Sequence, residues 1–433
     1  MRRFLSRSLM WKPTLLLLFL ALSCPSRAEL TIQITGQRAQ ATPIAIVPFK
    51  NAEGLKLDPA TVVRADLANS GYFNSLSVSH MLTQPHQAED IDFRHWRVLN
   101  QDYLVIGQIT PDSTGHEVRF QLFNVHDGVK LAGYRLHAPN HQLRQAGHQI
   151  SDLIFEHLTG QQGFFQSRIA YLSLETNAKG GKRYLINIAD VDGGNARSVV
   201  ASPQPLMSPA WSPKGNKLAY VSFERGKASI YVQELTTGKR ERVSDAPGLN
   251  GAPAWSPDGQ KLAMTLSKDG NPEVYVLNLA NRQLQRLTEN LAIDTEPAWS
   301  PDGQYLVFTS NRGGSPQLYK VAARGGRAQR LTFEGDYNAG ASFSPDGRYL
   351  AMVHGNRGDY RIAALDLGNQ TLTVLSAGNQ DESPSFAPNS HAILYATQKQ
   401  GNRHLAMVTV DGRSHPKQLN AVKGWVREPA WSP

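Results

Sequence analysis

The residues of this chain best suited to chemistry are repeated carboxylates. A Ser-Pro-Asp-Gly tetrapeptide places Asp258, Asp302 and Asp346 at intervals of 44 residues, and carboxylates are the ligands that Ca²⁺ prefers. Pro at the second position and Gly at the fourth are, however, the preferences of a type I β-turn. We therefore interpret each aspartate as a turn residue of its own repeat, remote from its copies.

Histidines are concentrated in the first third of the chain, which holds nine of the 13. Three residues separate His137 from His141, and His148 follows, so these side chains could supply zinc ligands. Pro139 lies between the first two, so they would not share one regular element. We interpret all three histidines as solvated surface residues and predict no metal site.

The first 28 residues have the pattern of a secretory signal peptide. Basic residues precede an apolar run, 15–22, and small residues lead to Ala28. A run this short cannot span a bilayer. We expect cleavage after Ala28, with lipoprotein-type processing at Cys24 as an alternative, and a product exported to a bacterial periplasm.

Removing this signal changes the charge and the thiol content. The formal net charge of the chain is +9, but without the signal's five basic residues 40 basic side chains face 36 acidic ones. The only cysteine, Cys24, is lost with the signal. The mature chain would then hold no disulfide, thiolate metal site or cysteine nucleophile, and its charge gives no reason to expect a nucleic-acid partner.

The last two thirds of the chain carry a repeat with a period near 44 residues. Each unit opens with Trp-Ser-Pro or a related tripeptide, at Trp211, Trp255, Trp299, Phe343, Phe386 and Trp431. Sets of three further strands are expected to begin near Arg168, Lys217, Lys261, Tyr305, Tyr349 and Ala392. This period is typical of the four-stranded blades of a β-propeller.

The ends of the repeat array predict how the ring closes. The strand set at Arg168 has no Trp-Ser-Pro segment before it, and the segment at Trp431 has no strands after it. The C-terminal strand should therefore complete the first blade and leave no free sheet edge. We predict a mainly β protein with a six-bladed propeller of WD40-like (PD40) repeats over 163–433.

The stretch 29–160 lacks the repeat and predicts a small α/β domain. Asp58 and Pro59 are typical of a helix start and Gly160 of a helix end. We expect strands over 44–49, 103–109, 117–124 and 130–136, and helices after Asp58, over 91–100 and over 142–158. The mature N-terminus alternates polar and apolar residues, which predicts a mobile strand able to pair with the sheet edge of a partner.

Motifs of known active sites are missing from the sequence, including Gly-x-Ser-x-Gly, His-Glu-x-x-His and the phosphate-binding loop. We therefore predict no catalytic, cofactor or metal residues. In a propeller, loops of all blades meet at the ends of the central channel, and Leu249, Asn250, Thr295 and Glu296 lie on such loops. An exported propeller hydrolase or peptidase-like enzyme is the alternative, and a glycan-binding protein is a third possibility.

Several segments resemble the TolB family, the periplasmic propeller proteins of the Tol-Pal system. In the repeat region these are 205–213, 250–254 and 295–299. In the N-terminal third they are 69–74, 105–111 and 147–152. Trp-Ser-Pro-Asp-Gly alone is shared by many propellers, but its combination with the N-terminal motifs is specific.

The resemblance implies a non-enzymatic scaffold in the periplasm of a Gram-negative cell, which supports outer-membrane integrity and outer-membrane constriction during division. It implies binding of the peptidoglycan-associated lipoprotein Pal through the propeller mouth, at Leu249, Asn250, Gly251, Ala252, Thr295 and Glu296. It also implies that the inner-membrane protein TolA binds the mature N-terminus, Glu29, Leu30, Thr31, Ile32, Gln33, Ile34 and Thr35. Other envelope proteins or bacteriocins could use the same mouth. We expect a monomer without cofactor or membrane span.

Overall fold

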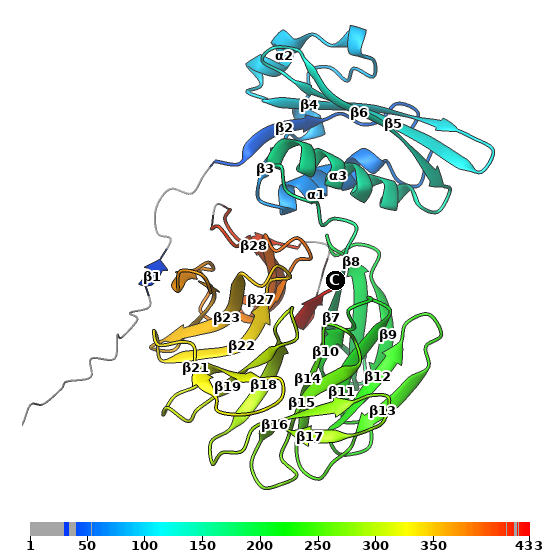
Figure 1. Ribbon diagram of the computed structural model, residues 1–433. Coiled ribbons are helices and arrows are strands. Elements are labelled where there is room, and N and C mark those ends of the chain that lie inside the picture. The colour runs from blue at the N-terminus through cyan, green and yellow to red at the C-terminus, as the bar shows by residue number, and fades with distance from the viewer. Residues whose placement is uncertain (1–29, 34–39, 53, 413, 420–421, 423) are drawn as a thin grey trace, which may run out of the picture.

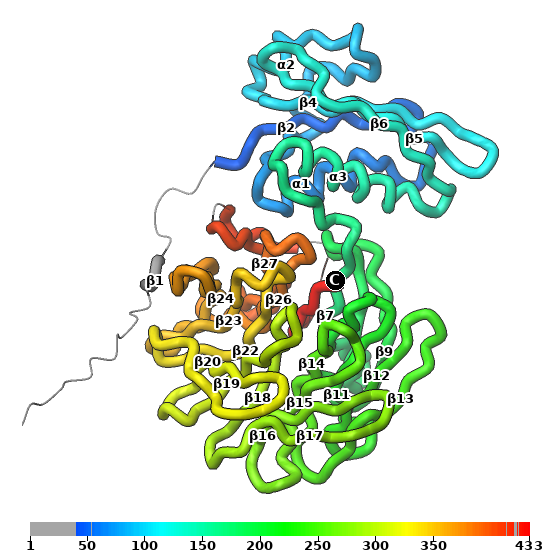
Figure 2. Tube along the Cα trace, in the orientation of Figure 1, coloured from blue at the N-terminus to red at the C-terminus, as the bar shows by residue number. Residues whose placement is uncertain are grey.

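The computed structural model describes residues 30–33, 40–52, 54–412, 414–419, 422 and 424–433 (Figure 1). The predicted signal peptide lies outside these residues, as do Glu29, Ile34 and Thr35 of the expected TolA epitope. The described residues form a mixed α/β domain followed by a propeller of six sheets, as the sequence predicts. Figure 2 shows the N-terminal domain standing against one side of the propeller.

The N-terminal domain is built on a five-stranded sheet. Its strand order is β3 (Phe73–Ser75), β2 (Thr42–Ile46), β4 (Tyr103–Pro111), β5 (Gly115–Asn124) and β6 (Lys130–Pro139). β2 is parallel to both neighbours, whereas β4, β5 and β6 form an antiparallel meander. Helices α1 (Pro59–Asn69) and α3 (Leu143–Thr159) cover one face, and the segment with η1 (Val78–His80), η2 (Ala88–Asp90) and α2 (Phe93–Val98) covers part of the other.

The helix boundaries follow from local chemistry and confirm the sequence prediction. The Asp58 carboxylate accepts a hydrogen bond from the Ala60 N–H at 3.0 Å, and Pro59 is the first residue of α1. Gly160 ends α3 with a φ of 70°, a left-handed conformation that favours glycine.

The first three blades follow one another around the ring. Blade 1 contains β30 (Trp425–Trp431), β7 (Arg168–Thr176), β8 (Lys182–Asp190) and β9 (Arg197–Ser202). Blade 2 contains β10 (Leu206–Trp211), β11 (Lys217–Ser222), β12 (Ser229–Glu234) and β13 (Arg240–Ser244). Blade 3 contains β14 (Asn250–Trp255), β15 (Lys261–Leu266), β16 (Glu273–Asn278) and β17 (Leu284–Arg286).

The other three blades continue the same order from the inside outward. Blade 4 contains β18 (Asp294–Trp299), β19 (Tyr305–Ser310), β20 (Gln317–Ala322) and β21 (Gln329–Arg330). Blade 5 contains β22 (Tyr337–Phe343), β23 (Tyr349–Asn356), β24 (Asp359–Asp366), β25 (Thr371–Val374) and, added at its outer edge, β1 (Leu30–Gln33). Blade 6 contains β26 (Glu382–Phe386), β27 (Ala392–Lys399), β28 (Asn402–Thr409) and β29 (Lys417–Gln418).

The Ser-Pro-Asp-Gly tetrapeptides are turns between the first two strands of a blade, as predicted. The Ser256 hydroxyl donates to Asp258 Oδ1 at 2.5 Å, and the same oxygen accepts from the Gln260 N–H at 2.9 Å. The Gly259 N–H closes the turn on the Ser256 carbonyl at 2.8 Å. Equivalent bonds hold Asp302 and Asp346 in their own turns. Each aspartate therefore serves its own blade.

The C-terminal strand closes the ring, which confirms the predicted closure. β30 pairs antiparallel with β7, and the Ser432 N–H donates to the Arg168 carbonyl at 2.8 Å. Trp431 is 5 % exposed, and its indole N–H donates to Ser167 Oγ at 2.7 Å. The indole also packs edge-on against Phe164, with 5.5 Å between ring centroids. One side chain therefore connects the tail, the first blade and the link to the N-terminal domain.

α3 docks on the propeller through a buried ionic cluster, which contradicts the interpretation of His148 as a surface residue. His148 Nδ1 lies 2.8 Å from Asp66 Oδ2, and its Nε2 lies 3.5 Å from Oδ2 of Asp190, the last residue of β8. Arg144 Nε donates to the same Asp190 oxygen at 2.6 Å, and its guanidinium also pairs with Asp192. His148 was misassigned because its partners lie on other elements, far away in the sequence.

Two groups of this cluster bind their protons unusually tightly. Burial raises the pKa of Asp66 to about 6, although hydrogen bonds from His148 and Ser151 act in the opposite direction. Burial alone would lower the pKa of His148, but its hydrogen bonds to Asp190 and Asp66 outweigh that effect and raise the pKa to about 9. The interface is therefore a cationic helix face bound to an acidic turn.

We expect Trp431→Ala to lower the free energy of unfolding by about 3–5 kcal/mol, because it removes a buried indole and its hydrogen bond at the closure. Trp425→Ala is the matched control, since Trp425 lies on the same strand but is 37 % exposed; it should cost about 1 kcal/mol or less. Urea unfolding followed by circular dichroism measures both. Equal midpoints for the two variants would contradict the closure role of Trp431.

We expect stability to fall as pH rises. Both pKa values are raised on folding, from 3.8 for Asp66 and 6.5 for His148, so the folded protein binds more protons than the unfolded chain. The unfolding free energy should fall between pH 3.8 and 6 through Asp66, and between pH 6.5 and 9 through His148. Melting temperatures at pH 6.5 to 9 should decline less for His148→Gln than for wild type or the exposed-site control His141→Gln. Parallel curves for all three proteins would rule this out.

Candidate partner-binding site at the channel mouth

The innermost strand of every blade carries a β-bulge at the same repeat position. The register of the inner strand pair shifts there, for example between Met207 and Ala210. One residue of each bulge has a left-handed φ of 46° to 63°: Ser208, Ala252, Glu296, Gly340, Ser383 and Glu428. Only one of these six is glycine. The other five hold a conformation that costs about 1–3 kcal/mol, which is typical of functional sites.

Hydrogen bonds to a neighbouring blade hold three of these bulges. The Ser208 N–H donates to Glu428 Oε2 at 2.6 Å, and the Gly340 N–H donates to Glu296 Oε2 at 3.0 Å. The Glu296 N–H in turn donates to Thr265 Oγ1 of the preceding blade at 3.2 Å. The bulges therefore fix the blades to one another and set the shape of the channel opening.

A cavity of about 520 Å³ opens at this ring. Its walls combine bulge residues, including Glu296 and Glu428, with Tyr337 and Tyr360 of blade 5. The bulges precede the Ser-Pro-Asp-Gly turns along each inner strand, so the mouth lies at the blade end opposite those turns. The N-terminal domain contacts the other end, where the β8–β9 turn lies, and leaves the mouth open.

The mouth is acidic, with its arginines already paired. Glu382 accepts hydrogen bonds from Arg403 at 2.7 Å and from Arg427 at 2.7 and 2.8 Å. Burial raises the pKa of Glu428, to which the nearby charges of Glu382 and Glu296 add. Burial likewise raises the pKa of Asp381. The arrangement provides hydrogen-bond acceptors for a partner that brings donors or positive charge.

The predicted Pal contacts lie in different environments. Glu296 lines the cavity, and Leu249 is 46 % exposed on the loop before blade 3. Gly251, Ala252 and Thr295 are half-buried beside the mouth. Asn250 is only 1 % exposed, because its amide is bonded to Ser244, Ala246 and Gly248. Its side chain therefore shapes the loop from inside and is not presented at the surface.

Sequence reasoning placed Glu428 on one of the loops that lead into the inner strands but did not single it out as a partner contact. Glu428 occupies the same repeat position as Glu296, so alignment of the repeats would have ranked the two together. Arg403 and Tyr360 lie on hairpins between the second and third strands of their blades, where the repeat has no marked position. Only the closed ring brings them to the mouth.

The segment that follows the predicted signal peptide forms a strand where it is described. β1 pairs parallel with β25 at the outer edge of blade 5, from Leu30 opposite Thr371 to Gln33 opposite Val374. This confirms the predicted strand over Leu30–Gln33. Its role as a TolA epitope stays a prediction.

Among the described residues, Asp66, His148 and Asp192 are close enough to be considered as metal ligands. Arg144 already pairs with Asp192, and His148 Nδ1 is hydrogen-bonded to Asp66. A metal ion would have to displace both of these bonds. Within the part of the chain that the structure describes, no helix is long and apolar enough to cross a membrane.

Comparisons with known proteins agree over both domains. A family described as the TolB amino-terminal domain matches residues 30–131, and one described as the TolB beta propeller domain matches residues 155–433. The chain is 58 % identical to the Tol-Pal system protein TolB of Nitrosococcus oceani over 96 % of both chains. It is 56 % identical to that of Methylococcus capsulatus over 98 % of both.

A solved structure agrees with these matches. The crystal structure of TolB from Acinetobacter baumannii is similar with a TM-score of 0.83 and 42 % identity, over 92 % of this chain and 98 % of that one. The chain therefore belongs to the TolB family of Tol-Pal system proteins.

Proposed function

We propose that this protein is a non-enzymatic periplasmic scaffold that binds Pal at the channel mouth and TolA through its mature N-terminus. In this role it supports outer-membrane integrity and outer-membrane constriction during division. The six left-handed bulges, five of which line an acidic cavity, are the observation that carries the proposal. A backbone fixed in this way loses little conformational entropy when a partner binds.

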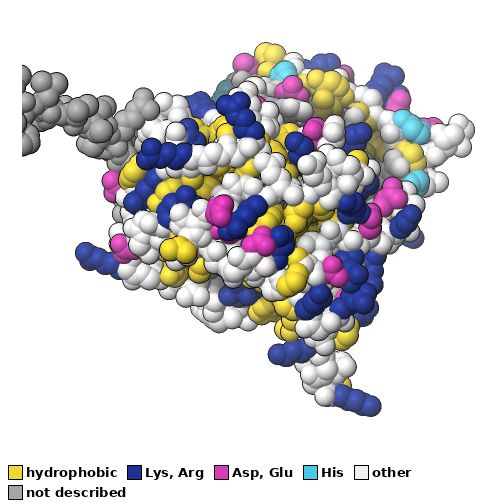
Figure 3. All heavy atoms as spheres, turned by 60° about the horizontal axis from the view of Figure 1, so that its bottom comes forward, with side chains coloured by type: hydrophobic (Ala, Val, Ile, Leu, Met, Phe, Trp, Pro, Cys, Tyr) yellow, Lys and Arg dark blue, Asp and Glu magenta, His cyan; other side chains and the backbone are white. Residues whose placement is uncertain are grey.

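The surroundings of the mouth support a protein partner. Large hydrophobic side chains are exposed on the strands and loops that lead into the inner strands: Met207, Leu249, Leu291, Ile293, Phe333 and Trp425. Exposed apolar groups gathered on one end of a domain are typical of interaction surfaces. Figure 3, which brings the lower side of Figure 1 forward, shows hydrophobic side chains grouped between charged ones on the propeller surface.

The N-terminal strand supports a mechanism of competition. β1 pairs with β25 over four residues only, as an added strand at the outside of blade 5. A strand this short costs little to release. In the proposed mechanism β1 exchanges between this docked position and a released state that TolA binds, and occupancy of the mouth by Pal shifts the balance.

Within this proposal Leu249, Gly251, Ala252, Thr295 and Glu296 contact Pal, and Asn250 holds their loop in place. We expect Leu249→Arg combined with Thr295→Arg to weaken binding of purified Pal by at least about tenfold, because two bulky charges would be desolvated at the contact. Leu82→Arg, at an exposed position of the N-terminal domain, is the control. Calorimetric titration measures the affinity, and an unchanged Kd for the double variant would refute the mapped surface.

We further expect deletion of residues 29–35 to abolish capture of purified TolA while leaving Pal binding equal or stronger. The deletion removes the only strand proposed to reach TolA and leaves the mouth intact. Pull-down with each partner measures both effects on one preparation. Full TolA capture by the deleted protein would place the TolA site elsewhere.

A further inference from the structure

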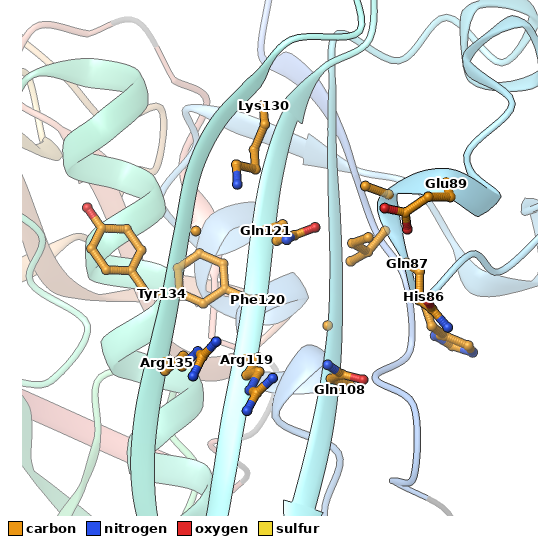
Figure 4. A pocket seen from close by; sticks show the side chains of 14 residues that line it. His86, Gln87, Glu89, Gln108, Arg119, Phe120, Gln121, Lys130, Tyr134 and Arg135 are labelled. Atoms are coloured by element: carbon orange, nitrogen blue, oxygen red, sulfur yellow. The ribbon is translucent and has the colours of Figure 1, made fainter.

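A second surface, in the N-terminal domain, has no part in the proposed function. A groove of about 360 Å³ lies over β4, β5 and β6, on the face opposite α1 and α3. The segment with η2 forms its wall, through residues that include His86 and Glu89. Figure 4 shows Arg119, Gln121 and Arg135 standing on adjacent strands of its floor. The groove ends at β6, the last strand of the sheet.

β6 has a free edge. Among the described residues, β5 is its only strand partner over the ten residues Lys130–Pro139. The exposed side chains on this strand include Tyr134, Arg135 and His137. Edge strands of this length are sites at which another chain can add a strand.

The hydrogen-bond pattern identifies which backbone groups face that edge. Gly115 opposes Pro139, but its N–H donates to Asp112 Oδ1 at 2.8 Å and its carbonyl accepts from the Asp112 N–H at 3.0 Å. This pair is therefore not bonded across the ladder. Bonded and open pairs alternate in antiparallel sheets, so the groups of β6 that point outward belong to Gly133, Arg135 and His137.

Two arginines face each other on the floor of the groove. Arg119 and Arg135 are directly opposite in the β5–β6 register, and in an open pair the Cα atoms lie about 4.5 Å apart. Like charges placed opposite each other destabilise a sheet. Glu117 pairs with Arg119, whereas Arg135 and Lys130, which both line the groove, have no ion-pair partner among the described residues. The floor therefore has unneutralised positive charge beside unpaired backbone groups.

We propose that an acidic, extended segment of a partner protein adds to β6 as a sixth strand. Its backbone pairs with Gly133, Arg135 and His137, and the carboxylate that comes beside Arg135 lies on the groove side, toward Arg119 on the next strand. A free strand edge and an adjacent row of cations fit this ligand together. A second copy of this chain fits poorly, because pairing two β6 edges would place one Arg135 near the other.

The charge requirement is tested with two labelled ten-residue peptides, one alternating Thr with Glu and one alternating Thr with Gln. Fluorescence anisotropy with the mature chain should show binding of the Glu peptide at least about tenfold tighter than of the Gln peptide. Arg119→Gln combined with Arg135→Gln should weaken binding of the Glu peptide by a similar factor. Arg183→Gln combined with Arg225→Gln, exposed on the propeller, is the matched control and should leave binding unchanged.

The backbone requirement is tested with two N-methylated forms of the Glu peptide, modified at odd or at even positions. Strand addition uses every second amide, so one form should lose binding and the other should keep it. Hydrogen exchange should show protection of residues 133–137 on binding. The proposal is overturned if the Glu peptide does not bind, if both methylated forms bind equally, or if tripolyphosphate binds as tightly as the peptide. Those last two results would indicate a simple anion site.

These results are independent of the mouth and of the N-terminal strand. Loss of Pal or TolA binding in the experiments above would not affect the β6 peptide assay. Dimerisation of the mature chain that the Arg119→Gln and Arg135→Gln pair enhances would assign the edge to a second copy and also overturn the proposal.

Discussion

The pairing of the C-terminal strand β30 with β7 closes the propeller and completes its first blade. Without it, blade 1 would lack its inner strand and the ring would have an open seam. β30 also contributes Glu428, one of the six left-handed residues, and its carboxylate bonds the next bulge at Ser208. The mouth is complete only when the two ends of the propeller have met, so closure and the candidate site form together.

At the mouth, strained left-handed backbone conformations are held by contacts with neighbouring blades. Each left-handed residue would relax in an isolated strand, but bonds to the neighbouring blade hold Ser208, Glu296 and Gly340 in place. The same bonds position acidic groups toward the cavity, where burial raises the pKa of Glu428. The shape and charge of this surface are therefore set before anything binds, which lowers the entropy cost of binding.

The two domains are joined by a different kind of interaction. Arg144 and His148 of α3 bind the acidic β8–β9 turn, at the propeller end remote from the mouth. Aromatic packing of Phe164 against Trp431 lies beside this cluster and connects it to the closure strand. The N-terminal domain is thus anchored where it leaves the mouth open, and its own groove at β6 faces away from α3. Two separate surfaces can serve two partners.

The blades could be predicted from the sequence, because a 44-residue period and the turn chemistry of Ser-Pro-Asp-Gly are local properties. Strand starts at Arg168, Lys217 and Tyr349, the closure by the tail, and the cap at Asp58 were all predictable for that reason. Which side chains meet, in contrast, follows from how the chain folds in three dimensions. His148 looked like a surface residue until folding brought Asp66 and Asp190 to it, and Asn250 is withdrawn into its own loop. Arg403 on β28 reaches Glu382 on β26 because both strands lie in the same blade, on either side of β27. Burial and charge pairing depend on contacts between residues far apart in sequence, and a local sequence pattern does not predict such contacts.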